Sequence, residues 1–69
     1  MKLHINGEEK TYPSPLTLAA VVESLGMKAD RVAIELNREI ALRASWGEIM
    51  LNDGDRLEIV HFVGGGTPD

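Results

Sequence analysis

The sequence contains no cysteine, so disulfides, thiolate catalysis and the usual zinc frameworks are excluded together. It has only two histidines, His4 and His61, and their wide separation in the chain argues against a structural metal site. The formal net charge is −4 and the basic residues are scattered, so the basic patch typical of nucleic-acid-binding proteins is missing. We therefore expect no bound metal and no nucleic-acid partner.

Long apolar runs are also missing. The longest, residues 18–22, is far shorter than a membrane span, and the first residues lack the apolar centre of a signal peptide. These absences predict a cytoplasmic protein with no membrane partner. With 69 residues, the chain can form only one domain with a modest core, which leaves little room for a deep substrate cleft. Its size favours a binding module or a carrier over an independent enzyme.

Apolar alternation predicts strands near both ends of the chain. Leu3 and Ile5 alternate with polar residues, and Asn6-Gly7 is a strong hairpin signal because both residues tolerate positive φ. Residues 8–12 then form the returning strand, which stops at a proline-rich stretch. Residues 56–62 are the last predicted strand, and we expect it to lie beside the first.

A helix is predicted between these strands. Thr17 suits its N-cap and Gly26 its left-handed C-terminal residue. Between them, apolar residues recur every three or four positions and form one stripe: Leu18, Val21, Val22 and Leu25.

The later segments are shorter. Residues 32–36 alternate as a strand, Asn37-Arg38 is a turn, and residues 39–42 are a short strand. Ser45 followed by Glu48 resembles a capping box and predicts a short helical turn. Trp46, between them, either anchors a partner or closes one end of the core. Asp53 and Asp55 flank Gly54 in a turn, where their expected role is to bind backbone N–H groups.

These elements predict an α+β roll with a mixed sheet of four to five strands and one main helix packed on one face. The folded domain spans residues 1–63. Residues 64–69 (Gly-Gly-Gly-Thr-Pro-Asp) have no apolar side chain and are predicted to form a flexible glycine-rich C-terminal tail. Leu57 and Ile59 should face the helix, so Val60 and Phe62 should form an exposed apolar patch on the other sheet face and bind a partner.

Several stretches resemble the thiamine-biosynthesis sulfur carrier family (ThiS), whose fold is a ubiquitin-like β-grasp roll. The resemblance covers residues 1–66 and rests on the order and spacing of its pieces. These are Asn6-Gly7, Leu16-Thr17-Leu18, Val32-Ala33-Ile34-Glu35-Leu36-Asn37, Arg43-x-x-Trp46, Leu51-x-Asp53-Gly54-Asp55 and Val60-His61-Phe62-Val63-Gly64-Gly65-Gly66.

The resemblance implies a sulfur carrier that binds no cofactor itself. An adenylating (ThiF-like) enzyme would activate the carboxylate of Gly66 with ATP and Mg²⁺, and a sulfur donor protein would convert it to a thiocarboxylate. Thiazole synthase would then take the sulfur for the thiazole ring of thiamine. Gly64 and Gly65 would form the arm, because residues without a Cβ can thread a narrow channel.

The sequence departs from the family pattern after the glycines, where Thr67, Pro68 and Asp69 follow. We expect a tail-trimming protease to remove these three residues and leave Gly66 as the activated end. Two alternatives stay open: a sulfur carrier for molybdopterin or another sulfur-containing metabolite, and a ubiquitin-like interaction module that transfers nothing.

Overall fold

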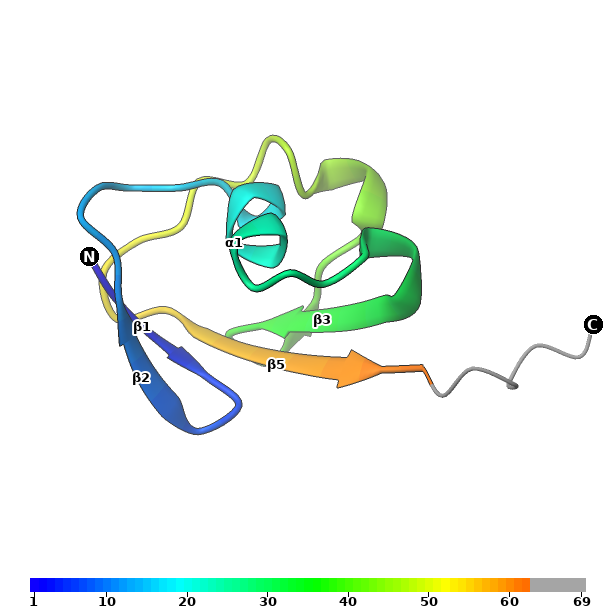
Figure 1. The fold of residues 1–69 in the computed structure, drawn as a ribbon, viewed down its shortest axis with the longest axis horizontal. Coiled ribbons are helices and arrows are strands. Elements are labelled where there is room, and N and C mark those ends of the chain that lie inside the picture. Colours follow the sequence, from blue (N-terminus) through cyan, green and yellow to red (C-terminus); the bar gives the residue numbers. More distant parts are fainter. Residues whose placement is uncertain (63–69) are drawn as a thin grey trace, which may run out of the picture.

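The computed structural model describes residues 1–62, which form a five-stranded mixed sheet with one α-helix across one face (Figure 1). The predicted α+β fold is therefore confirmed, and the sheet has the larger of the two expected strand numbers. The strands are β1 (Lys2–Ile5), β2 (Glu8–Thr11), β3 (Val32–Leu36), β4 (Glu39–Ile40) and β5 (Arg56–His61), in the spatial order β2-β1-β5-β3-β4. The helical elements are α1 (Leu18–Ser24) and two 3₁₀ turns, η1 (Ala29–Arg31) and η2 (Arg43–Ser45).

The first hairpin forms as predicted. Asn6 and Gly7 have φ values of 51° and 83°, the left-handed conformation that a two-residue hairpin turn requires. The side chain of Asn6 also continues the sheet. Its Oδ1 accepts a hydrogen bond from the Ile59 N–H (2.7 Å) and its Nδ2 donates one to the Ile59 carbonyl (3.2 Å). One amide group thus joins the hairpin to β5 where the backbone pairing of β1 ends.

Strand β5 occupies the centre of the sheet. It lies parallel to β1, with Ile5 opposite Leu57, and antiparallel to β3, with Ile34 opposite Ile59. The expectation that the last strand lies beside the first is confirmed.

The helix begins and ends at the predicted residues. Thr17 Oγ1 accepts a hydrogen bond from the Ala20 N–H at 3.1 Å, as an N-cap should. At the other end Gly26 has a φ of 74°, and the N–H of Met27 donates to the Val22 carbonyl (3.2 Å). This pairing is the Schellman arrangement, which satisfies the carbonyls of the last turn.

The core lies between α1 and the sheet. Its buried side chains come from the helix, from the inward positions of three strands, and from the loop between β4 and β5. They are Leu3, Ile5, Leu18, Val21, Val22, Val32, Ile34, Trp46, Leu51, Leu57 and Ile59.

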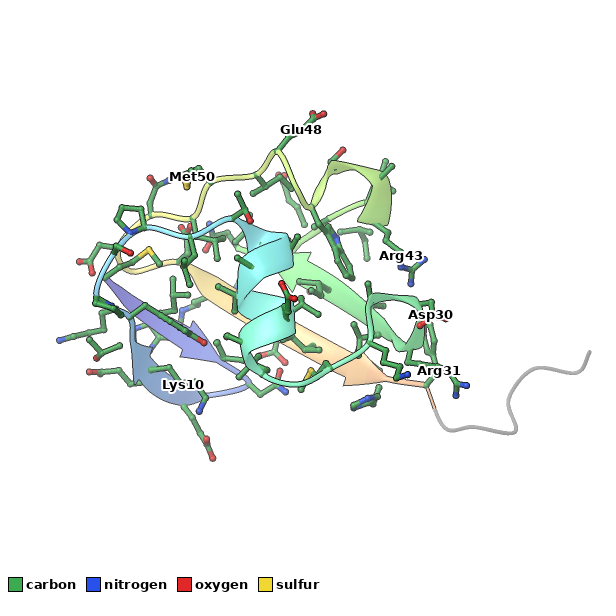
Figure 2. All side chains as sticks on the ribbon, turned by 45° about the horizontal axis from the view of Figure 1, so that its top comes forward. Lys10, Asp30, Arg31, Arg43, Glu48 and Met50 are labelled. Carbon is green, nitrogen blue, oxygen red and sulfur yellow. The ribbon has the colours of Figure 1, made fainter. Side chains whose placement is uncertain are left out.

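The segment after β4 differs from the prediction. The strand expected over residues 39–42 is only two residues long, Glu39–Ile40, and the helical turn begins at Arg43. The cause is the Arg43 guanidinium, whose Nε donates to the Ala29 carbonyl (2.7 Å) and whose Nη2 donates to the Val32 carbonyl (3.0 Å). Figure 2 shows Arg43 on η2, near Asp30 and Arg31 of η1. These bonds draw the chain away from the sheet edge and support η1, which the sequence did not predict.

Two side chains of this segment take different roles from those first considered. Trp46 is 3% exposed and its Nε1 donates to the Ala41 carbonyl at 2.8 Å, so it closes the core and the alternative of a partner anchor is wrong. The capping box is also wrong in detail. The Ser45 backbone carbonyl, rather than its side chain, accepts the hydrogen bond from the Glu48 N–H (2.9 Å).

Candidate functional site

The sheet face away from α1 carries exposed apolar side chains on β5. Leu57 and Ile59 point into the core, and alternation turns Val60 toward solvent, where it is 60% exposed. Phe62, directly after the strand, is 50% exposed. Among residues 1–62 no helix covers this face (Figure 1). The predicted exposure of Val60 and Phe62 is confirmed, and their role in partner binding stays a prediction.

The strand register extends this patch into a groove. Ala33 lies opposite Val60, Glu35 opposite Glu58, and Ile40 of β4 is the other partner of Glu35. Directly opposed residues point to the same side of a sheet, so all five side chains belong to the open face. They line a shallow groove together with Ile34: Ala33, Ile34, Glu35, Ile40, Glu58 and Val60. We call it the open-face groove.

Ile40 is a groove residue that the sequence reasoning missed. Its side chain is 68% exposed, although it is apolar and lies in a strand. A short strand does not reveal from its sequence which face each residue takes. The pairing of β3 with β4 reveals its face. Glu35 points away from the core because it follows the buried Ile34, and Ile40 lies opposite Glu35 and shares its face.

The groove also holds two opposed carboxylates. Glu35 and Glu58 are both exposed and lie directly across from each other on β3 and β5. Within residues 1–62 the only ion pair joins Lys2 and Glu9, whose Nζ and Oε2 are 3.5 Å apart, so neither groove glutamate is paired there. Like charges opposite one another weaken a sheet. This arrangement therefore has a stability cost.

The end of β5 is fixed in place. The Phe62 N–H donates to the Arg31 carbonyl at 2.9 Å, which continues the β3–β5 pairing to the last described residue. The glycines of the arm (Gly64, Gly65), the predicted activated Gly66, and Thr67, Pro68 and Asp69 lie outside the described residues. The predictions made for them, and for residues 64–69 as a tail, stay predictions.

The remaining polar candidates take structural positions. Asp53 Oδ1 accepts from the Lys2 N–H (2.7 Å), and Asp55 Oδ2 accepts from the Asn52 N–H (2.7 Å), so both aspartates bind backbone as expected. His4 and His61 sit on different strands, and in the described part of the chain no three histidine or acidic side chains are grouped to hold a metal. Across residues 1–62 no helix is long and apolar enough to span a membrane.

Comparison with known proteins decides the family. The model of the ThiS family matches residues 3–66. The chain belongs to the ThiS family. The sulfur carrier protein ThiS of Bacillus subtilis is 35% identical over 65 residues, which cover 93% of this chain and 98% of that protein. The crystal structure of a thiamine biosynthesis protein (ThiS) from Geobacter metallireducens superposes with a TM-score of 0.81 at 32% identity, covering 96% of this chain and all of that one.

Longer ThiS-like relatives also exist. A thiazole synthase of Paramagnetospirillum magneticum is 46% identical over 67 residues, which are 97% of this chain. The ThiS-family chain spans only 21% of that protein and 20% of a second thiazole synthase, from Magnetococcus marinus.

Proposed function

We propose that this chain is a sulfur carrier for the thiazole ring of thiamine and that the carboxylate of Gly66 is its reactive group. The observation that carries the proposal is the extent of the family match, which runs through residue 66 and includes all three glycines. The relatives named sulfur carrier protein ThiS support the same role.

The proposed chemistry begins with activation of the carboxylate. A carboxylate oxygen of Gly66 attacks the α-phosphorus of ATP on an adenylating enzyme, pyrophosphate leaves, and an acyl-adenylate forms. Hydrosulfide released by a donor protein then attacks the carbonyl carbon and displaces AMP, which yields the thiocarboxylate. ATP and Mg²⁺ belong to the partner enzyme, so the carrier acts as a protein substrate and not as an enzyme.

Thiazole synthase is the proposed acceptor of the sulfur. Two relatives named thiazole synthase, each with a segment similar to nearly all of this chain, support this partner over the molybdopterin pathway. We place the exchange in the cytoplasm, where the proposed partners would meet the carrier.

The proposal requires a free carboxylate on Gly66, so Thr67, Pro68 and Asp69 must first be removed. A trimming protease supplies that step. Intact-mass spectrometry of the protein from its native cell tests it, and we expect a species that ends at Gly66. If every chain carries residues 67–69, trimming is refuted.

The decisive experiment incubates the chain ending at Gly66 with ATP, Mg²⁺, the ThiF-like adenylating enzyme of the same organism and sulfide. We expect the intact mass to show one oxygen replaced by one sulfur. The 69-residue chain is the matched control and should remain unchanged, because its terminal carboxylate belongs to Asp69. A trimmed chain that consumes no ATP and gains no sulfur would refute the carrier function.

A further inference from the structure

The chemistry of the open-face groove indicates what kind of side chain it accepts. Two apolar side chains, Ile40 and Val60, are 68% and 60% exposed, and they flank the opposed carboxylates of Glu35 and Glu58. Side chains opposite each other in a sheet have Cβ atoms about 4.5–5.5 Å apart, so one group can contact both glutamates. The groove therefore places two carboxylates next to each other between exposed apolar side chains.

The fold gives no reason for this combination. The glutamates cover no core residue, and in the described chain no basic side chain lies within ion-pair distance of either. Replacing one of them with a neutral residue would remove a repulsion and no described hydrogen bond or ion pair. A bound partner that neutralises the pair would give it a function that the free protein lacks.

We propose that the open-face groove receives an arginine or lysine side chain of the adenylating enzyme. Its cationic group binds between Glu35 and Glu58, and its aliphatic stem packs against Ile40 and Val60. Long basic side chains match this lining because their stems are apolar and their ends charged. Arginine fits best, since its planar fork can donate to two carboxylates at once. This inference rests on the proposed function, which supplies the partner.

Charge argues against the other occupants. A nucleic acid would be repelled by the two glutamates, and a second copy of the chain carries a net charge of −4 of its own. An enzyme that presents a cation beside apolar side chains is attracted to this face and also buries Val60.

The test compares the free energy of unfolding with affinity. Glu35→Gln and Glu58→Gln are made in the 69-residue chain, and binding to the ThiF-like adenylating enzyme is measured by calorimetry at low and high salt. We expect each variant to bind about fivefold to tenfold more weakly at low salt, with a smaller difference at high salt. Each should unfold at the same urea concentration as the parent or at a higher one. Glu58→Lys should raise the urea midpoint further, by pairing with Glu35, and weaken binding most.

Glu23→Gln is the matched control. It makes the same change in charge on α1, across the sheet from the groove, where Glu23 is exposed. Its affinity should equal that of the parent chain.

Each contrary result is distinct. If Val60→Ala weakens binding and the two glutamine variants do not, the cation site is refuted and the docking face survives. If the glutamine variants lose stability along with affinity, the glutamates are structural and the inference falls. Self-association of the parent chain that Glu58→Gln abolishes would assign the groove to a second copy and also overturn it. A parent chain that does not bind the enzyme overturns this inference, whereas the proposed function stands or falls separately with sulfur transfer to the chain ending at Gly66.

Discussion

The two faces of the sheet are built from the same strands but from different kinds of side chain. On β5, the inward Leu57 and Ile59 are 1% and 7% exposed, whereas the outward Glu58 and Val60 face solvent. The inward positions contact the helix, and their size and shape are limited by packing. The outward positions contact nothing in the described chain that limits them in this way. The comparison shows that folding dictates one face and leaves the other available for binding.

The largest expected effect comes from exchanging matched isoleucines on the two faces. Ile34 of β3 is 1% exposed and Ile40 of β4 is 68% exposed. Ile34→Ala removes buried methyl groups and leaves a cavity, so we expect a loss of about 2–5 kcal/mol in the free energy of unfolding. A domain of this size has only roughly 3–10 kcal/mol in total. Ile40→Ala should lose less than about 0.5 kcal/mol. Urea unfolding measures both, and equal losses would break the comparison.

Substitutions of Asn6 test the hydrogen bonds that join the first hairpin to β5, the strand that contributes to both faces. Asn6→Ala removes both hydrogen bonds to Ile59 and places alanine at a φ of 51°, so we expect a loss of about 1–3 kcal/mol. Asn6→Gly also removes the bonds but tolerates the φ, so it should lose less. Hydrogen exchange at the Ile59 amide should increase in both variants. Unchanged exchange there would show that the Asn6 side chain does not hold β5.

The open face is tested by binding. Phe62→Ala should weaken association with the adenylating enzyme about tenfold, or about 1.4 kcal/mol, because exposed aromatic side chains often dominate interfaces. Its urea midpoint should stay close to that of the parent, since Phe62 is half exposed. Calorimetric titration measures the affinity. Unchanged affinity would remove Phe62 from the docking surface.

The smallest effect is expected at the helix cap, on the covered side only. Thr17→Ala removes the acceptor for the Ala20 N–H and should lower the free energy of unfolding by about 1 kcal/mol. Thr17→Ser retains the oxygen and should restore most of it. Neither should change affinity for the enzyme once the protein is folded. A loss of affinity in both variants would mean that the two faces are not independent.

Much of the fold could be predicted because its signals are local. The positive φ of Asn6 and Gly7, the Thr17 cap and the Gly26 terminus each depend on neighbouring residues. The turn η1 could not be predicted, since it is supported by Arg43 from a segment that begins after β4. Patterns of neighbouring residues do not predict a hydrogen bond between segments so far apart in the sequence.

The candidate site could be predicted in part for the same reason. Alternation along β5 was enough to predict that Val60 is exposed. The place of Ile40 in the groove and the pairing of Glu35 opposite Glu58 follow only from the strand register. The prediction that Gly66 is the activated residue rests on the family match and not on the geometry of residues 1–62.

The central place of β5 has a mechanical consequence. Any pull on the residues that follow His61 acts along the length of this strand, which is bonded on one side to β1 and on the other to β3. Such a load shears many hydrogen bonds at once, whereas an edge strand would peel away one bond at a time. A partner that pulls on the residues after β5 would therefore leave the domain folded.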